Sequence, residues 1–334
     1  MRLGEVRLGI VRLSALFAMH VLLVTVAKVA ADPPAETKVT EVKKADATST
    51  KTTAASTATP SPSNKSLRVA TVQMRSTRVL AENIAATKKH LERCARDGVR
   101  LVVFPECSVT GYFDVDYIKR FTSDQLADAE RQIAEACREH QIYAIVGMPW
   151  REGGKLYNSA IVIDPEGKVV ERYHKLHLAE AWPDGGDHLS VFKVDGVPCS
   201  IIICHDERYP ELVRLPVLAG SRCVFVISHE SGLKEEKKIN PYRAQLQARA
   251  VENTVFVVQA NAPANRDATG SHGQSRIIAP DGNLIEEATI FGEDVLTATL
   301  NLGLATGNMS RGSVLHGPLA DWWKDGIKKV RVID

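Results

Sequence analysis

Short apolar runs alternate with helix-like segments from Leu67 to about Leu300, and this alternation constrains the fold more than any other feature. Strand signals separated by helix signals favour a β-sheet covered by helices. Two of the runs, 200–203 and 224–227, are almost wholly apolar, which indicates strands buried on both faces. The pattern alone therefore predicts an α/β fold, a sandwich of a mixed sheet and helices in a single domain.

The individual elements follow from apolar spacing and from Gly and Pro punctuation. We expect helices at 81–96, 124–140, 209–219 and 241–252. We expect strands at 67–74, 101–104, 142–147, 156–163, 169–173, 189–194, 197–203, 223–227, 254–261, 274–278, 284–288 and 295–300.

The beginning of the chain differs in kind. Three arginines precede an apolar run from Leu13 to Ala27, and small residues follow at 29–31. This arrangement is typical of a secretory signal peptide. We therefore expect residues 1–31 to be removed and the protein to be exported, periplasmic or secreted, with no stable membrane insertion afterwards. The alternative is an uncleaved N-terminal membrane anchor, for which the run is short, since a span needs roughly twenty residues.

Residues 32–66 are rich in Thr, Ala, Ser, Pro and Lys, with almost no large apolar side chain. Such a segment cannot bury enough apolar surface to offset the entropy lost on ordering it. We expect a disordered linker over 32–66 and one folded domain over 67–334.

The charge balance bears on the partners that we expect, and the cysteine contexts bear on whether disulfides form. The chain has 42 basic and 40 acidic side chains, a net charge of +2, which gives no electrostatic reason to expect nucleic acid. The six cysteines stand mostly in apolar strand or helix contexts, where a small buried thiol is the common state. We expect no structural disulfide.

Three apolar strands are each followed closely by a side chain suited to acyl transfer. Glu106 follows 101–104, Lys175 follows 169–173, and Cys204 follows 197–203. Sites on open α/β sheets gather at such strand ends. Taken singly, these are an ordinary turn glutamate, a solvated lysine and a small buried cysteine. Together they supply a proton carrier, an oxyanion donor and a nucleophile.

The environment of each group would tune it. Burial would raise the pKa of Glu106 towards that of a general base. Cys204 falls at a strand-to-helix junction, where the helix N-terminus should favour the thiolate. The backbone N–H of His205, at the same junction, could bind an oxyanion.

Histidines offer two alternative interpretations. His205 could serve as the base of a Cys–His pair, although adjacent side chains on a turn usually point apart. His174 and His177 have His-x-x-His spacing, but no third ligand stands at a matching spacing. We expect neither a metal site nor an organic cofactor.

The motifs around these residues resemble those of the nitrilase, or carbon–nitrogen hydrolase, superfamily from about Leu67 to Leu300. They are Phe104-Pro105-Glu106, then 173–178, 204–211, 249–253 and 273–282, in the family's order. The resemblance implies a four-layer α-β-β-α sandwich and a Glu106–Lys175–Cys204 triad.

The resemblance also suggests substrate-site residues. A second glutamate of the family corresponds best to Glu180, with a surface glutamate as the alternative. Arg208 matches in place an arginine that binds the substrate carboxylate in N-carbamoyl amino-acid hydrolases, although Glu207 beside it departs from that pattern. Residues after other strand ends could line the pocket: Tyr112, His229 and Glu230.

We therefore expect hydrolysis of a non-peptide C–N bond in an amide or N-carbamoyl small molecule, through a cysteine thioester, with release of ammonia or an amine. Nitrile hydrolysis, N-acyl transfer and a catalytically inactive binding module are the alternatives. The resemblance further implies a homodimer or larger homo-oligomer, and the stretch 315–334 with Trp322 and Trp323 could cover its interface.

Overall fold

The computed structural model describes residues 66–232, 239–267 and 269–333. The predicted signal peptide lies outside the described residues, and so does the predicted linker except for Ser66, which begins the first strand. No helix in the described ranges is long and apolar enough to cross a membrane.

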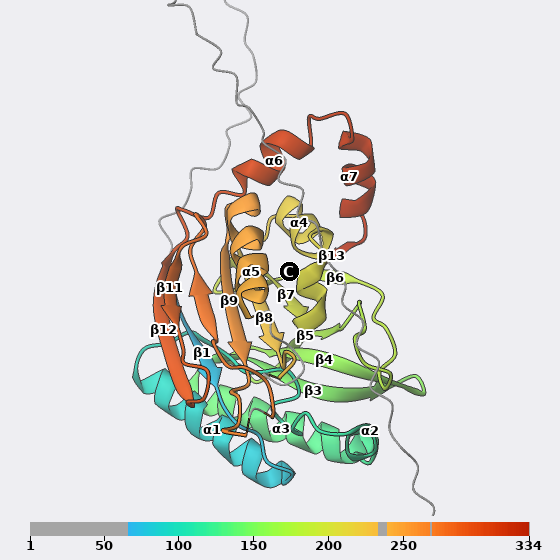
Figure 1. Cartoon of the computed structure of the whole chain (residues 1–334), viewed down its shortest axis with the longest axis vertical. Helices are drawn as coiled ribbons and strands as arrows, with labels where there is room; N and C mark the ends of the chain where they lie inside the picture. Colours follow the sequence, from blue (N-terminus) through green and yellow to red (C-terminus); the bar gives the residue numbers. More distant parts are fainter. Residues whose placement is uncertain (1–65, 233–238, 268, 334) are drawn as a thin grey trace, which may run out of the picture. The chain divides into compact units, whose positions relative to one another are not determined.

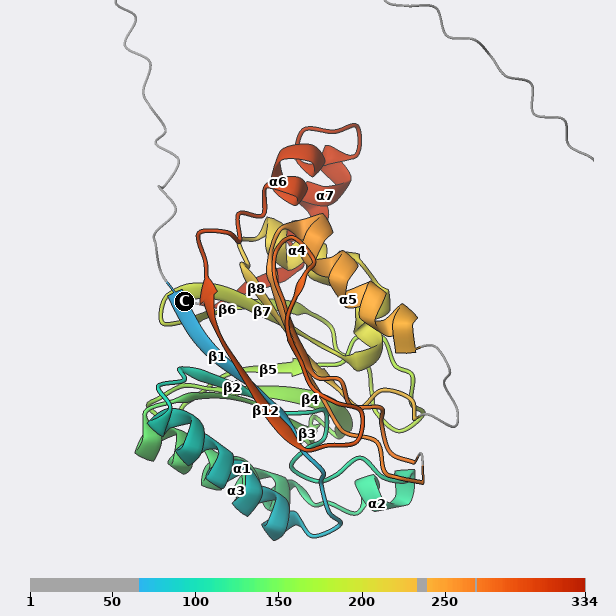
Figure 2. The same cartoon turned by 60° about the vertical axis from the view of Figure 1, so that its left-hand side comes forward.

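Two β-sheets form the middle of the folded domain (Figures 1 and 2). The strands of the first are β1 (Ser66–Gln73), β2 (Leu101–Val103), β3 (Tyr143–Glu152), β4 (Lys155–Ile163), β5 (Val169–His174) and β12 (Asp294–Asn301). Those of the second are β6 (Leu189–Val194), β7 (Val197–Ile203), β8 (Cys223–Ser228), β9 (Phe256–Asn261), β10 (Arg276–Ile278), β11 (Leu284–Glu287) and β13 (Val330–Val332). The strand orders are β12-β1-β2-β3-β4-β5 and β11-β10-β9-β8-β7-β6-β13.

Helices cover the outer face of each sheet, which completes an α-β-β-α sandwich (Figure 2). Helices α1 (Leu80–Arg96) and α3 (Ser123–His140) pack on the first sheet. Helices α4 (Glu211–Leu218) and α5 (Ile239–Asn253) cover the second. Three shorter helices complete the chain, namely α2 (Val115–Lys119), α6 (Asn308–Val314) and α7 (Ala320–Ile327).

Strand β1 shows why both faces of the sheets are apolar. Its Leu67 and Val69 pack between the two sheets, whereas Ala70 and Val72 pack towards α1 and α3. Side chains of a strand point to alternate faces, so a strand between two layers must be apolar at nearly every position. All four residues of 224–227 are fully buried, as their sequence predicts.

Three expected elements begin two residues later than predicted: α4, β9, which starts at Phe256 after the left-handed Thr254 (φ 52°), and β10. The helix expected from residue 209 starts at Glu211, after a five-residue 3₁₀ turn, η1 (Cys204–Arg208). Tyr209 is extended, with φ −108° and ψ 98°, because the residue before a proline is disfavoured in the helical region. Strand β10 starts only at Arg276, since Gln274 has a left-handed φ of 58°.

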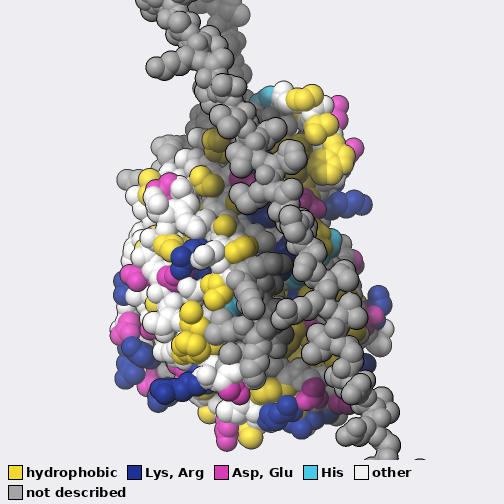
Figure 3. Space-filling model, viewed as in Figure 1, with side chains coloured by type: hydrophobic (Ala, Val, Ile, Leu, Met, Phe, Trp, Pro, Cys, Tyr) yellow, Lys and Arg dark blue, Asp and Glu magenta, His cyan; other side chains and the backbone are white. Residues whose placement is uncertain are grey.

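Elements α2, α6, α7 and β13 were not expected from the sequence, and α2 and α6 are the shortest of the helices. Helix α7 and the residue before it expose large apolar side chains to solvent. Trp322 is 60% exposed and Leu319, just before the helix, 64%. Figure 3 shows apolar side chains gathered at the upper right, where α7 lies in Figure 1. That this stretch covers a subunit interface stays a prediction.

Candidate active site

Glu106, Lys175 and Cys204 meet in one site, although they follow strands of two different sheets. Glu106 follows β2 and Lys175 follows β5 in the first sheet, whereas Cys204 follows β7 in the second. The Lys175 Nζ donates a hydrogen bond to Glu106 Oε1 at 3.0 Å. Both charges act on the Cys204 thiol, the carboxylate raising its pKa and the ammonium lowering it. The packing of the two sheets therefore assembles the predicted triad residues.

Glu106 is almost fully buried, with 1% of its surface exposed. Its Oε1 accepts hydrogen bonds from Lys175 and from Asn158 Nδ2 (2.6 Å), and its Oε2 accepts one from the backbone N–H of His229 (2.7 Å). Burial raises the pKa of Glu106 to about 7, against the opposing effect of the Lys175 ammonium. A carboxyl group with such a pKa can both accept and return a proton near neutral pH.

Lys175 is completely buried and contacts a second carboxylate. Its Nζ donates to Glu180 Oε1 at 2.5 Å, and the Tyr112 hydroxyl donates to the same oxygen at 2.7 Å. Burial disfavours the ammonium, but Glu106, Cys204 and Glu180 together raise the pKa of Lys175 above its usual value. The cation is therefore retained. Glu180 lies in the site and not at an exposed turn.

Cys204 occupies a strained position at the start of η1. Its φ is 46°, a conformation that residues other than glycine adopt at a cost of about 1–3 kcal/mol. Burial, and next the Glu106 charge, raise the pKa of the thiol well above its usual value. The expectation that a helix N-terminus favours the thiolate is wrong, because α4 begins only at Glu211. The Cys204 thiol is therefore neutral in the resting protein, and attack by its sulfur would require a base.

Asp206 fixes this turn, a role that the sequence analysis missed. Its Oδ2 accepts hydrogen bonds from the Tyr173 hydroxyl (2.8 Å) and the Ile203 N–H (3.1 Å), and its Oδ1 accepts one from the His177 N–H (2.8 Å). Asp206 is fully buried. Because it bonds to segments on both sides of Lys175, it ties η1 to the end of β5. No local sequence pattern indicated the burial of Asp206, because packing alone decides it.

Cys204 lines a cavity of about 470 Å³. The predicted substrate-site residues all line it as well: Tyr112, Glu180, His205, Arg208, His229 and Glu230. Sequence reasoning missed Tyr242, whose hydroxyl accepts a hydrogen bond from Arg208 Nη2 at 2.7 Å. The guanidinium of Arg208 is thereby held at the cavity while its residue stays exposed.

The histidines of the cavity are neutral. The His229 ring stacks on Tyr112 with centroids 4.6 Å apart, and burial lowers the pKa of His229 to about 4. The His205 ring lies edge-on to Tyr209, and burial lowers its pKa too. A Cys–His pair needs the ring of His205 on the Cys204 sulfur. The structure instead places it against Tyr209.

The two histidines of the His-x-x-His spacing contact different residues. His174 Nδ1 is hydrogen-bonded to Ser159 Oγ at 2.8 Å, whereas the His177 ring stacks on Tyr209 at 3.5 Å. In the ranges that the structure describes, no three His, Cys, Asp or Glu side chains gather in a way that could hold a metal ion.

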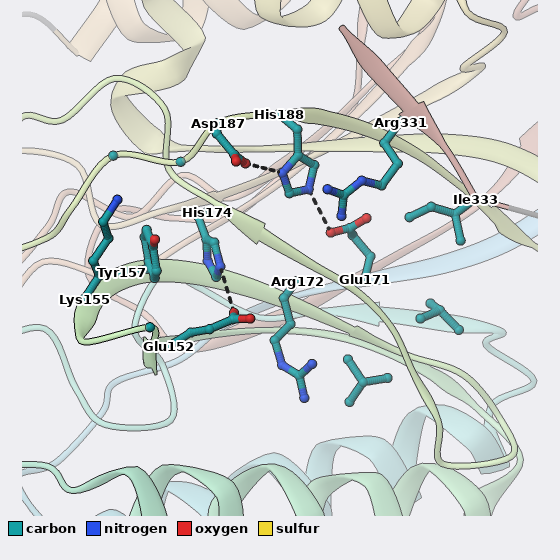
Figure 4. Close-up of a pocket in the computed structure, with 15 residues that line it drawn as sticks. Glu152, Lys155, Tyr157, Glu171, Arg172, His174, Asp187, His188, Arg331 and Ile333 are labelled. Atoms are coloured by element: carbon teal, nitrogen blue, oxygen red, sulfur yellow. Dashed lines mark hydrogen bonds and ion pairs between the residues drawn. The ribbon is translucent and has the colours of Figure 1, made fainter.

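A larger cavity, of about 690 Å³, lies apart from this site, between β5, residues 185–188 and the C-terminal end (Figure 4). In it His188 bridges Asp187 (2.7 Å) and Glu171 (3.4 Å). Its lining holds no cysteine and none of the predicted site residues. The chemistry therefore points to the smaller cavity at Cys204.

Comparison with known proteins agrees with this architecture. Residues 68–307 match the family model for carbon–nitrogen hydrolase. The chain is 28% identical over 213 residues to the 2-oxoglutaramate amidase of Bacillus subtilis, which covers 62% of this chain and 80% of that protein. It is 25% identical over 248 residues to the omega-amidase NIT2 of Homo sapiens, covering 68% and 88%.

The crystal structure of an amidase from Nesterenkonia sp. superimposes with a TM-score of 0.66 at 22% identity, covering 75% of this chain and 95% of that one. The fold is thus the α-β-β-α sandwich of the nitrilase superfamily, as the resemblance implied. The chain belongs to the carbon–nitrogen hydrolase family.

Proposed function

We propose that the protein hydrolyses the C–N bond of an amide or N-carbamoyl small molecule through a thioester on Cys204. One observation carries the proposal. A neutral thiol lines the cavity beside a buried carboxylate with a pKa of about 7, and that carboxylate is hydrogen-bonded to a buried ammonium. The amidase names of the relatives support an amide substrate.

The first half-reaction forms the thioester. Glu106 takes the thiol proton as the Cys204 sulfur attacks the carbonyl carbon. The Lys175 ammonium and the backbone N–H of His205 stabilise the oxyanion, and each such donor contributes on the order of 10²–10³ in rate. Glu106 then gives its proton to the departing nitrogen, the C–N bond breaks, and ammonia or an amine leaves.

The second half-reaction releases the acid. Glu106, again ionised, takes a proton from a water molecule as the water oxygen attacks the thioester carbon. The C–S bond breaks, the proton returns to the sulfur, and the free acid leaves. Glu180 acts through Lys175, since its carboxylate holds the ammonium in place and helps to keep it charged.

Arg208 supports a substrate that carries a carboxylate. Its guanidinium lines the cavity and is held by Tyr242. Guanidinium groups match carboxylates in charge and geometry. Both a monoamide of a dicarboxylic acid and an N-carbamoyl amino acid would meet this requirement.

Ammonia release from four compounds tests the proposal: succinamate, N-carbamoylglycine, butyramide and butyronitrile. We expect release from one of the first two to be fastest, and none with Cys204→Ala. Release from the nitrile alone, or from none of the four, would contradict the proposed activity. Equal turnover of butyramide would contradict the role of Arg208.

Replacing the buried cation of Lys175 should lower the rate of hydrolysis and raise the pKa values of the neighbouring acidic groups. We expect Lys175→Met to lower kcat/KM by about 10²–10³-fold, the range for an oxyanion donor. Without the ammonium, the pKa values of Glu106 and Cys204 should both rise, because Lys175 lowers each of them. Alkylation of Cys204 by iodoacetamide, followed by intact mass against pH, should therefore need a higher pH. The other five cysteines are buried, so one adduct is expected.

The exposed Lys89→Met variant is the matched control for this experiment and should behave like the wild type. An unchanged pH dependence of alkylation in Lys175→Met would show that the ammonium does not act on the thiol. Melting curves of both variants separate this electrostatic effect from a loss of folding.

We also propose that the protein is exported after removal of residues 1–31. The support is the arginine-rich start, the apolar run and the small residues at 29–31. N-terminal sequencing of the protein recovered from outside the cytoplasm should begin at Asp32. A mature chain beginning at Met1 would contradict cleavage.

A further inference from the structure

A buried ion pair that the mechanism above does not use borders the Cys204 cavity. Glu230 Oε2 and His272 Nε2 are 2.5 Å apart, and the two residues are 2% and 0% exposed. Glu230 belongs to the segment that follows β8 and lines the cavity. His272 belongs to the loop between β9 and β10.

The ion pair is part of a set of hydrogen bonds that fixes the segment after β8. His272 Nδ1 donates to the Ser231 carbonyl oxygen at 3.0 Å. The backbone N–H of Glu230 donates to Asn261 Oδ1 at 3.2 Å, and Gln259 Nε2 donates to Glu230 Oε1 at 2.5 Å. The segment is thus anchored both to strand β9 and to the loop that follows it.

The charge state of the pair follows from its partners. A carbonyl oxygen only accepts, so His272 must carry a proton on Nδ1. Its Nε2 lies at ion-pair distance from a carboxylate, which favours a second proton on the ring. Burial opposes both charges, but Glu230 raises the pKa of His272 and His272 lowers that of Glu230. The pair is an imidazolium and a carboxylate.

The same segment contacts Glu106. The backbone N–H of His229, the residue before Glu230, donates to Glu106 Oε2 at 2.7 Å. Lys175 and Asn158 contact the other oxygen, Oε1. A displacement of Glu230 would therefore move the donor that serves Oε2.

We propose that Glu230 and His272 are positioning residues for the hydrolysis. Their ion pair holds the His229 N–H against Glu106 Oε2, which keeps the carboxylate in place and stabilises its charged form. This inference rests on the proposed role of Glu106 as the proton carrier. A hydrogen bond to a carboxylate favours ionisation, so loss of this donor should raise the pKa of Glu106.

The test uses His272→Gln and Glu230→Gln, which remove the ion pair but keep polar side chains. With the faster of succinamate and N-carbamoylglycine as substrate, we expect kcat to fall roughly 10- to 100-fold, as for a lost hydrogen bond to a charged group. KM should change less than about threefold, and the acid limb of kcat/KM should move to higher pH by up to about one unit.

Other titratable groups also face Glu106, and they could move that limb by themselves. They are Lys175, Glu180, Tyr112, Cys107 and Cys204. A double-mutant cycle removes this ambiguity. If the ion pair acts through Glu106, His272→Gln should cause little further loss of kcat in the Glu106→Gln background.

Exposed positions supply the matched controls, His316→Gln and Glu286→Gln, which should leave the pH profile unchanged. A lower melting temperature with an unmoved acid limb would overturn the inference and leave a structural role only. A rise in KM alone would make Glu230 a substrate contact. Full activity of Glu106→Gln would instead refute the proposed role of Glu106 as the proton carrier, on which this inference rests. Loss of all turnover in the wild type on both substrates would refute the proposed function.

Discussion

Cys204→Ala should abolish hydrolysis, with turnover lowered ~10⁴-fold or more, because no other group in the cavity can form the thioester. The variant should fold normally. Removal of one sulfur from a half-buried position changes little packing. The hydrogen bonds of Asp206 that fix η1 do not involve this side chain and are kept. Ammonia release and a melting curve measure the two effects separately.

The comparison variant for this experiment is Cys94→Ala, at a buried cysteine of α1 far from the predicted triad in the chain. It should lose some stability but keep its turnover. Substrate binding to Cys204→Ala, measured by calorimetry, should persist, since the thiol contributes attack and not ground-state affinity. Residual turnover of Cys204→Ala above a few per cent of the wild-type rate would contradict the thioester mechanism.

Glu106→Gln should have the second-largest effect, a loss of roughly 10²–10⁴-fold in kcat, the range for a positioned proton carrier. An amide cannot accept the proton of the neutral Cys204 thiol. It keeps the size of the carboxyl group, and Lys175 retains its ion pair with Glu180. The fold and the affinity for substrate should therefore be largely kept.

The pH dependence gives this prediction its sharpest form. Glu106 must be ionised to act as a base, and its pKa is about 7. The kcat/KM of the wild type should therefore fall as the pH drops below about 7, and Glu106→Gln should lose this acid limb. Glu166→Gln, at an exposed turn, should keep it. Near-native turnover of Glu106→Gln would return the His205-based Cys–His pair to consideration.

Much of the fold was predictable from the sequence because its signals are local. Strand alternation and helical spacing arise from the steric periods of the backbone, and they located β6 and β7 to the residue. The predicted bounds were wrong where a single residue changed the backbone conformation, as at Tyr209 before Pro210. The shortest helices, α2 and α6, have too few turns to show a period.

The sequence by itself determined which side chains stand at the strand ends, and therefore the thiol, carboxylate and ammonium of the site. Tertiary structure alone decided how these groups are placed relative to one another and which of them are ionised. Glu106 and Cys204 follow strands of different sheets, and their pKa values depend on burial and on charges distant in the chain. The contacts that hold them, from Asn158, Asp206 and the Glu230–His272 pair, leave no local pattern, because desolvation and hydrogen bonding are set by packing.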